Sequence, residues 1–501
     1  MTRLPATLAE LRASGWRERA VKDEIRENLL RRIAAGEPTF PGIHGYERTV
    51  ISAIHNALLA RHDIILLGLR GQAKTRILRS LVHLLDETIP VVDGCEINDS
   101  PLAPVCKRCR RLVREVGEAL PVAWVGRDER YREKLATPDV TVADLIGDID
   151  PIKAANQRLT YADEEVIHYG IIPRTNRGIF AVNELPDLAP RIQVALLNIL
   201  EERDLQIRGF PVRIPLDVLL VFSANPEDYT NRGNIITPLK DRIDSQILTH
   251  YPTSVETAMT ITKQEAWLGR DGTGAAIEIP DYVRELVESV AFAARESELV
   301  DQSSGVSARM AISAIEILES NLERRAALTG EREVFPRLAD LQMILPAITG
   351  KVEMVYEGEQ QGAEVVAKKL VGTAVGRLFA QRFPPIERGR TRPGADDEDE
   401  SPTPGGAADY EPVVAWFLEG NKVTLSDEQP FADYARELER VPALGEIADR
   451  WFRPRHARER AFAMELVLEG LHQALRLARE DLDSTITFSE MIKFNILRTV
   501  K

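Results

Sequence analysis

Ile64-Ile65-Leu66-Leu67-Gly68-Leu69-Arg70-Gly71-Gln72-Ala73-Lys74-Thr75 is the stretch of sequence that decides the fold. Its apolar beginning predicts a buried strand, and its Lys-Thr end opens a helical pattern. The layout is that of a phosphate-binding loop, G-x-x-x-x-G-K-[ST], with Ala73 in place of the second glycine. Backbone N–H groups of such a loop point at an anion, and the helix N-terminus adds favourable partial charge. We therefore expect Lys74 to reach the β- and γ-phosphates of a nucleotide and the Thr75 hydroxyl to bind Mg²⁺.

The composition is that of a globular protein with more than one domain. The chain has 501 residues, enough for two or three domains with buried cores. Its net charge of −14 argues against nucleic acid as the main partner, because phosphate binding normally requires a basic face. The basic runs at 107–111 and 453–460 are interpreted as solvated helix faces or subunit contacts.

The sequence shows no targeting or membrane-spanning pattern. Its first fifteen residues lack the long apolar core of a signal peptide. No stretch approaches the roughly 20 apolar residues that a membrane-spanning helix needs. Three cysteines in so long a chain do not make a disulfide framework, so we expect a cytoplasmic protein.

The three cysteines, Cys95, Cys106 and Cys109, have the spacing C-x₁₀-C-x₂-C. A C-x-x-C knuckle brings two thiolates within reach of one tetrahedral ion, and Cys95 could supply a third. A fourth ligand would be a histidine, a carboxylate or water. Structural Zn²⁺ is therefore one interpretation, and free thiols or a redox pair are the others. The sequence leaves this choice open.

Two further apolar strands end in polar residues. The first, Gly178–Val182, has the form of a Walker B strand, with Asn183 where Asp is expected and Glu184 next. Glu184 stands where a carboxylate would polarise an attacking water. The second, Val218–Phe222, leads into a Ser-Ala-Asn-Pro turn that contains Asn225. Ligand contacts collect at the carboxyl ends of strands in open α/β sheets, so we expect these residues near the phosphate loop.

The rest of the sequence predicts helices, inserted loops and one linker. The segment 124–177 is rich in Gly and Pro and indicates hairpins or loops outside the core, whereas helical periodicity dominates after residue 254. A Pro/Gly/acidic linker, expected to be disordered, lies at about 384–410. We expect an N-terminal helical segment, an α/β nucleotide-binding domain, a helical lid and a helical C-terminal region, at residues 1–36, 37–253, 254–350 and 351–501.

Three signals thus follow one another in a fixed order: phosphate loop, acidic strand end, polar strand end. With this order the sequence resembles the AAA+ ATPases, and within them the magnesium-chelatase ATPase-subunit and MoxR-like group. The resemblance covers roughly residues 40–350 and is closest from Ala143 to Phe210, where this group places inserted β-hairpins around Walker B. It implies an α/β P-loop NTPase fold, an AAA+ core with a parallel sheet and flanking helices. A helical lid and a mainly helical C-terminal region would follow.

The resemblance also implies roles for individual residues. ATP and Mg²⁺ would be bound by Asn183 together with the Walker A residues. The Walker A residues are Gly68, Arg70, Gly71, Gln72, Ala73, Lys74 and Thr75. Glu184 resembles the catalytic Walker B carboxylate, and Asn225 resembles the sensor 1 residue that helps to position the attacking water. Arg242 is similar to the arginine finger offered to a neighbouring subunit, and Arg309 is similar to sensor 2 on the lid.

An arginine supplied by a neighbour implies a ring of identical subunits, in this group usually a hexamer. The resemblance further implies a partner protein with a von Willebrand factor A domain, which the ring remodels or activates as chelatase subunits or MoxR-like chaperones do. Ala73 and Asn183 depart from the family pattern and bear on the rate of hydrolysis. One alternative is a nucleotide-gated assembly protein with little turnover. Another is an enhancer-binding-type transcription activator, which uses the same ATPase core.

Overall fold

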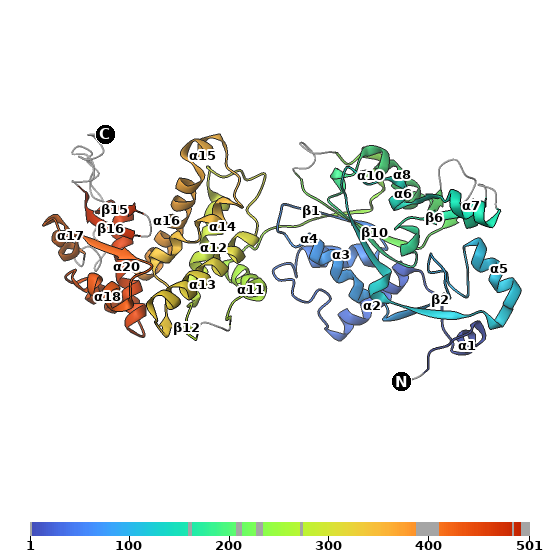
Figure 1. Cartoon of the computed structure of the whole chain (residues 1–501), viewed down its shortest axis with the longest axis horizontal. Coiled ribbons are helices and arrows are strands. Elements are labelled where there is room, and N and C mark those ends of the chain that lie inside the picture. Colours follow the sequence, from blue (N-terminus) through green and yellow to red (C-terminus); the bar gives the residue numbers. More distant parts are fainter. Residues whose placement is uncertain are drawn as a thin grey trace. The chain divides into compact units, whose positions relative to one another are not determined.

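The computed structural model describes residues 3–158, 163–206, 213–226, 234–270, 274–386, 410–482 and 485–491. The chain divides into two compact units, Met1–Tyr251 and Pro252–Lys501. Each unit has its own core, and each is described by itself below (Figure 1). Within the described residues, no helix is both long enough and apolar enough to cross a membrane.

The first unit is built on a five-stranded parallel sheet in the order β11-β1-β10-β7-β4. Its strands are β1 (Ile64–Leu67), β4 (Tyr131–Leu135), β7 (Gly178–Asn183), β10 (Val218–Ala224) and β11 (Ser245–Leu248). The two neighbours of β1 come from late in the unit, one on each side. The strand order therefore changes direction at β1, which is where open α/β sheets bind ligands beyond the carboxyl ends of their strands.

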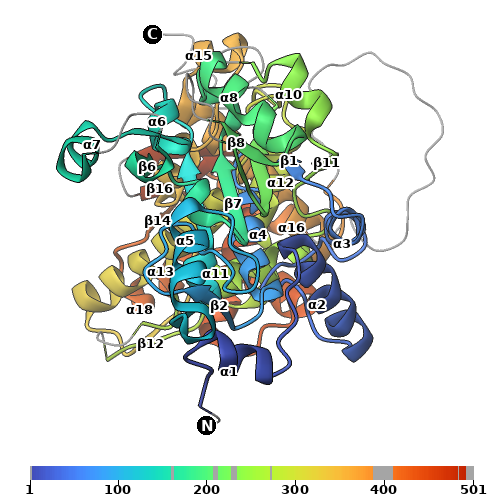
Figure 2. The ribbon, with the colours of Figure 1, turned by 90° about the vertical axis from the view of Figure 1, so that its right-hand side faces the viewer.

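Helices cover both faces of this sheet. Side chains alternate along a strand, so Ile64 and Leu66 of β1 pack into one layer and Ile65 and Leu67 into the other. The first layer contains α2 (Val21–Ala35), α3 (Val50–Leu59) and α4 (Lys74–Ser80), and the second contains α8 (Pro190–Glu201) and α10 (Thr237–Arg242). Figure 2 shows these two sets on opposite sides of β1. The predicted parallel sheet with flanking helices is confirmed.

Three antiparallel hairpins are added to this core. They are β2 (Thr88–Val92) with β3 (Val122–Gly126), β5 (Gly147–Ile149) with β6 (Ile167–Tyr169), and β8 (Asp204–Gln206) with β9 (Arg213–Pro215). The remaining helices of the unit are α1 (Leu8–Ala13), α5 (Lys107–Val116), α6 (Val142–Leu145) and α7 (Pro151–Gln157). The prediction that 124–177 lies wholly outside the core was wrong for β4, which pairs with β7 in the central sheet.

The second unit is mainly helical. Its helices are α11 (Val255–Glu265), α12 (Asp281–Glu296), α13 (Arg309–Thr329), α14 (Leu345–Thr349), α15 (Tyr356–Gln361), α16 (Ala363–Arg382), α17 (Glu411–Leu418), α18 (Phe431–Glu439), α19 (Leu444–Ile447) and α20 (Ala457–Gln473). Most residues of α20 are buried, so this helix forms the centre of the unit. The mostly helical character expected after the α/β domain is confirmed.

Strands in the second unit were not predicted. Two residues each of β12 (Ala276–Ile277) and β13 (Glu333–Val334) pair in parallel. An antiparallel sheet of order β14-β16-β15 is formed by β14 (Val423–Ser426), β15 (Leu477–Leu482) and β16 (Thr485–Glu490). These strands are short, so they leave the mainly helical character of the unit unchanged.

One hydrophobic core joins the elements of the second unit, from Tyr282 on α12 to Phe488 on β16. The predicted boundary between a lid at 254–350 and a C-terminal region at 351–501 falls inside this core, and the four-part division stays a prediction. Most of the predicted linker at about 384–410 lies outside the described residues. At its ends, the Tyr410 hydroxyl donates to the Pro384 carbonyl at 3.0 Å.

Candidate nucleotide-binding site

The loop between β1 and α4 has a tight backbone course. Gly71 and Ala73 both have positive φ, 74° and 57°, in the left-handed region. Glycine adopts this conformation freely, whereas a Cβ makes it unfavourable by about 1–2 kcal/mol. A Cβ at Gly68 would collide with the side chains of Gln72 and Thr249. The loop therefore needs glycine at 68, and Ala73 occupies a position that glycine would fit better.

Lys74 is the first residue of α4, and its ammonium group turns back over the loop. It is buried and donates hydrogen bonds to the carbonyls of Gly68 and Leu69 and to Asn225 Oδ1, the last at 2.5 Å. A buried ammonium is stabilised only when its hydrogens find acceptors. The loop thus concentrates positive charge beside the backbone N–H groups at the start of α4, which is the arrangement that binds phosphate.

Asn225 links this lysine to Glu184. Its Nδ2 donates to Glu184 Oε2 at 3.0 Å, while its Oδ1 accepts from Lys74. These three side chains come from the loop after β1, the end of β10 and the end of β7, three neighbouring strands. Glu184 itself has a positive φ of 55°, an uncommon conformation for a glutamate and one that often marks functional sites. The structure therefore brings the predicted Walker A, Walker B and sensor 1 residues together.

Asn183 is held by Ser223, the serine of the Ser-Ala-Asn-Pro stretch, which lies in β10 and not in a turn. Ser223 Oγ donates to Asn183 Oδ1 at 3.2 Å and accepts the Glu184 backbone N–H at 3.3 Å. Ser223 is fully buried in β10, so it fixes the direction in which β7 ends. A small polar residue in an otherwise apolar strand, two positions before Asn225, was the available signal.

Glu133 on β4 is a second residue that was missed. Arg79 of α4 donates to both of its carboxylate oxygens, with Nε at 2.9 Å and 3.1 Å. This pairing, helped by a hydrogen bond from Asn183, holds the pKa of Glu133 below its ordinary value. A carboxylate therefore lies beside Asn183, the position at which the family carries an aspartate. It was missed because β4 was not recognised as a strand of the central sheet.

The outer side of the loop is held by residues that follow β11. Thr249 Oγ1 donates to Gln72 Oε1 at 2.6 Å, and the Tyr251 hydroxyl donates to the Arg70 carbonyl at 2.8 Å. The Tyr46 hydroxyl donates to the Gln72 carbonyl at 3.1 Å, and burial raises the pKa of Tyr46 to about 12. These contacts fix the loop backbone. Thr75, predicted to bind Mg²⁺, is half-buried in the first turn of α4.

The two predicted arginines lie in different units. Arg242 ends α10 and is 30% exposed, and it pairs with Glu201 of α8 at 2.6 Å. Arg309 is the exposed first residue of α13 in the second unit. Neither is among the described partners of Lys74, Asn225 or Glu184.

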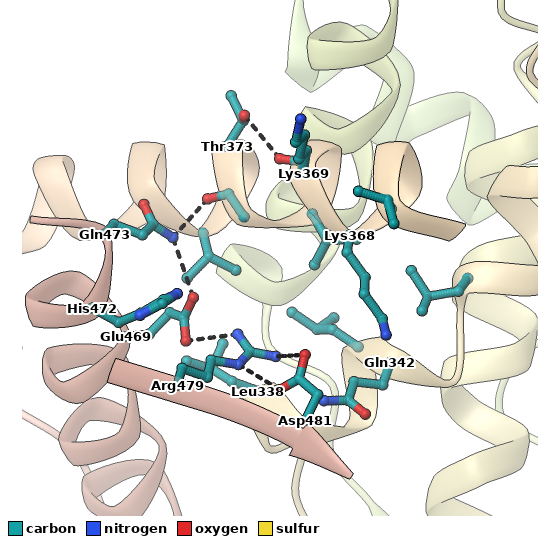
Figure 3. A pocket seen from close by; sticks show the side chains of 16 residues that line it. Leu338, Gln342, Lys368, Lys369, Thr373, Glu469, His472, Gln473, Arg479 and Asp481 are labelled. Atoms are coloured by element: carbon teal, nitrogen blue, oxygen red, sulfur yellow. Dashed lines mark hydrogen bonds and ion pairs between the residues drawn. The ribbon is translucent and has the colours of Figure 1, made fainter. Parts of the chain in front are cut away.

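The largest described pocket of the second unit has a different character. About 620 Å³ in volume, it lies between α16, α20 and β15. Arg479 is its most enclosed cation and is already paired with Glu469 at 2.7 Å and Asp481 at 2.8 Å (Figure 3). Two carboxylates pair with this arginine, and Lys368 and Lys369 also line the pocket, so its charges are mixed and no glycine-rich loop among the described residues approaches them.

The predicted metal ligands also come together. One ligand atom from each of Cys95, Cys106, Cys109 and Asp99 lies within 4.8 Å of all the others. The carboxylate that lies beside the three cysteines is Asp99, four residues after Cys95.

Residues 110–243 match the family model of the AAA domain, dynein-related subfamily. The chain contains an AAA domain. The match begins after the phosphate loop and includes Glu184, Asn225 and Arg242, so it rests on a part of the chain that does not contain Lys74. An AAA domain uses ATP with Mg²⁺. The tight loop, the buried lysine and the strand-end carboxylate fit this pair of cofactors.

Solved structures give weaker similarity, and no curated protein matches the sequence. A protein of Cytophaga hutchinsonii assigned as an ATPase has 14% identity and a TM-score of 0.30, over 72% of this chain and 97% of the other. A complex of the magnesium chelatase subunits BchI and BchD has 19% identity and a TM-score of 0.34, over 64% and 98%. NtrX from Brucella abortus with ADP has 15% and 0.32, over 60% and 55%. Scores this low transfer no function to the AAA domain described here.

Proposed function

We propose that the AAA domain binds ATP with Mg²⁺ and hydrolyses it within a ring of identical subunits that remodels a partner protein. The observation that carries this proposal is the hydrogen-bonded chain from Lys74 through Asn225 to Glu184. This chain brings a buried ammonium group and a strand-end carboxylate to the two sides of one amide. Such an arrangement supports a site in which the cation holds phosphate and the carboxylate activates water.

Each of these side chains has a distinct task in the proposal. Lys74 would neutralise charge on the β- and γ-phosphates, and Thr75 would hold the Mg²⁺, which would supply further positive charge there. Glu184 accepts a proton from the attacking water, and Asn225 orients that water by its amide. Asn183 would offer an amide oxygen to the Mg²⁺ site, and the neighbouring Glu133 carboxylate is already paired with Arg79.

Arg242 is proposed to act on the nucleotide of the neighbouring subunit. It stands at the end of α10, partly exposed, and its partner Glu201 is 54% exposed. Such an exposed ion pair contributes little to stability, so the arginine can exchange partners at low cost. This exposed arginine, together with the family resemblance of the sequence, supports a ring, and six is the expected number of subunits.

The partner of the ring is proposed from the sequence resemblance. The magnesium-chelatase and MoxR-like group carries hairpins on either side of Walker B, and this AAA domain has β5–β6 before β7 and β8–β9 after α8. On this basis the partner is a protein with a von Willebrand factor A domain. Whether the ring assists metal insertion or acts as a chaperone follows from which partner it binds.

A second function, nucleotide-gated assembly with little turnover, is favoured by one observation. Ala73 has a left-handed conformation inside the phosphate loop, and a Cβ there narrows the space in which the backbone approaches phosphate. In this case ATP binding would drive ring formation, but release of phosphate would be slow. Measurement of the hydrolysis rate alongside ring formation separates the two functions.

The test combines two variants that fail for different reasons. Glu184→Gln removes the proposed base, and Arg242→Ala removes the proposed finger, so each alone loses at least about 100-fold in ATPase rate. When the two are mixed, some interfaces pair an intact Glu184 with an intact Arg242, and activity partly returns. Glu202→Gln, an exposed glutamate after α8, is the matched control and keeps full activity.

Activity that does not return on mixing would contradict the assignment of Arg242 across subunits. A Glu184→Gln protein as active as the unchanged chain would contradict the assignment of the base. Light scattering with ATP present measures the ring, and a monomer under those conditions would contradict ring formation.

A further inference from the structure

Three cysteines and one aspartate gather beside the β2–β3 hairpin, away from the nucleotide site. They lie in the segment that connects β2 to β3, and none of the cysteines forms a disulfide. Cys106, Cys109 and Asp99 are buried, and Cys95 is half-buried. Four ligand groups from a short stretch of chain therefore converge on one point.

The spacing of the four groups fits a single tetrahedral ion. Zinc–sulfur bonds of about 2.3 Å place neighbouring sulfurs about 3.8 Å apart. The four ligand atoms of the cluster lie within 4.8 Å of one another, so shifts of about 1 Å or less would complete the geometry. A multi-iron cluster would need its ligands farther apart because they bind different iron atoms. Three thiolates with one carboxylate form a donor set that suits zinc.

The local backbone prepares these groups for a cation. Cys106 is the N-cap of α5, a helix of 10 residues, and its Sγ accepts the Cys109 backbone N–H at 3.3 Å. This contact orients the Cys106 sulfur beside Cys109 at the start of the helix. Asp99 accepts backbone N–H groups from Val105 at 3.1 Å and from Cys106 at 2.9 Å. An ionised carboxylate has further lone pairs, so it can bind a metal while it keeps these bonds.

A pocket gives access to the cluster. Its lining contains both cations and carboxylates, and Lys153 is paired with Glu96 at 3.1 Å, so the surroundings have no surplus of positive charge. Arg108 of α5 donates a hydrogen bond from Nη1 to the Gly94 carbonyl at 2.7 Å, next to Cys95. The pocket of about 230 Å³, lined by Cys95, Cys106, Arg108 and Lys153 among others, opens beside the cluster and gives an ion a route in.

We propose that Cys95, Asp99, Cys106 and Cys109 bind one Zn²⁺ ion that holds the segment between β2 and β3 in place. Binding replaces three thiol protons by the metal, so the affinity rises with pH. No residue of the proposed nucleotide site takes part, and the proposal stands independently of ATP hydrolysis.

The zinc site has a structural consequence for β7. The loop that contains Asp99 contacts the segment just before β7, where the Asn176 side chain donates to the Ile97 carbonyl at 3.0 Å. Arg177 donates to the Asn98 carbonyl at 3.3 Å and to the Pro90 carbonyl at 2.7 Å. Loss of the metal therefore loosens a support of the strand that ends in Glu184.

The experiment measures metal in the full-length chain purified under reducing conditions without chelator. About one Zn²⁺ per chain is expected by elemental analysis. Replacement by Co²⁺ should give the visible absorption of a tetrahedral cobalt thiolate site. Cys106→Ser and Cys109→Ser should each lower the zinc content to about a tenth or less, and chelation should lower the melting temperature of the unchanged protein.

Asp99→Asn separates metal binding from a role in fixing the backbone. The matched control is Asp150→Asn, because Asp150 also accepts two backbone N–H groups, at 2.9 Å and 3.0 Å, but has no cysteine beside it. Loss of zinc affinity in Asp99→Asn alone supports Asp99 as the fourth ligand. Equal zinc affinity in the two variants would contradict that ligand. A protein with all three thiols reduced, no zinc and no cobalt absorption would overturn the site.

Discussion

The two units use polar side chains in opposite ways. In the first unit, Lys74, Asn225 and Glu184 meet at the carboxyl ends of neighbouring strands, at an edge that a ligand can reach. In the second unit, Arg325 and Asp340 are enclosed among helices, with side chains at most 1% exposed and paired at 2.6 Å. Charged groups at a sheet edge indicate a binding site, whereas charged groups inside a helical core hold that core in one arrangement.

The enclosed network of the second unit supports this interpretation because its charged groups are paired, although Arg325 Nε and Asp427 Oδ1 are buried without a described hydrogen-bond partner. Asp340 accepts from Asn321 Nδ2 at 2.8 Å as well as from Arg325. Glu465 of α20 accepts from the Tyr434 hydroxyl at 2.6 Å and the Leu338 backbone N–H at 2.7 Å. Buried charges are tolerated only when they are paired in this way. Such a network links α13, α18 and α20 through directional bonds that apolar contacts alone would not provide.

The largest expected effect comes from breaking this network. Arg325→Met leaves the Asp340 carboxylate buried without its cation, which should lower the free energy of unfolding of the second unit by about 3–5 kcal/mol. Chemical denaturation followed by circular dichroism measures it. Arg436→Met, which removes an exposed partner of Asp433, is the control and should change stability by less than about 0.5 kcal/mol. Equal effects in both variants would refute the structural role of the buried pair.

A substitution in the first unit tests the side chains at the carboxyl ends of the sheet strands. Lys74→Ala should weaken ATP binding by about 100-fold, since two charge-assisted hydrogen bonds to phosphate are lost. It should leave the stability of the second unit unchanged. Fluorescence of a labelled nucleotide measures affinity, and Lys422→Ala, an exposed lysine outside the site, is the control. If the Lys74→Ala protein bound ATP as tightly as the unchanged chain, the assignment of Lys74 as a phosphate-binding residue would be wrong.

A pH profile offers a finer comparison. Burial raises the pKa of Glu288 on α12 from its ordinary value of 4.5 to about 7, against hydrogen bonding from Thr262. Between about pH 4.5 and 7, Glu288 is therefore protonated in the folded chain and ionised in the unfolded chain. The stabilisation is complete below about pH 4.5 and is lost as the pH rises through about 7.

Glu288→Gln should remove this loss of stability, about 3 kcal/mol between these pH values, because the amide stays neutral throughout. Stability is measured by denaturation at a series of pH values. Glu285→Gln removes a charge from a less buried position of the same helix and controls for net charge. A slope that persists in Glu288→Gln would assign the pH dependence to other groups.

The smallest effect concerns the phosphate loop itself. Ala73→Gly should raise the free energy of unfolding of the first unit by up to about 1 kcal/mol, because glycine accepts a φ of 57° without strain. Gly71→Ala, at a φ of 74°, should lower it by about 1–2 kcal/mol. Thermal denaturation of the two variants measures both. A loss of stability in Ala73→Gly would contradict the inference that the backbone of Ala73 is strained.

Sequence patterns predicted the polar residues at the carboxyl ends of the sheet strands well, because the signals for these positions are local. An apolar strand followed by a polar residue can be recognised within about ten residues, and β1, β7 and β10 were all predicted in this way. The strand β4 was not predicted. It is the outermost strand on one side of the sheet, and its sequence Tyr-Arg-Glu-Lys-Leu contains charged residues where the central strands have an apolar run. Glu133 was therefore missed although it lies beside Asn183.

The enclosed network could not be predicted, because its members are far apart in the chain. Arg325 and the Asp427 carbonyl meet at 3.3 Å, and Leu338 meets Glu465, only after the helices have packed. In the sequence each charge resembles one on a solvated helix face. Asp99 was nearer, four residues after Cys95, but only the fold shows which carboxylate the cysteines meet.

The register of the β2–β3 hairpin has one more consequence. Val92 and Val122 face each other across the two strands, so the long connection between them begins and ends at the same place. The cost of closing a loop grows slowly with its length, and the central sheet does not include this hairpin. Most of this connection is nevertheless fixed, because Cys106 and Cys109 pack in the core and Asn176 donates to the Ile97 carbonyl. Residues 114–119 are exposed, so a peptide tag or reporter domain is best inserted there.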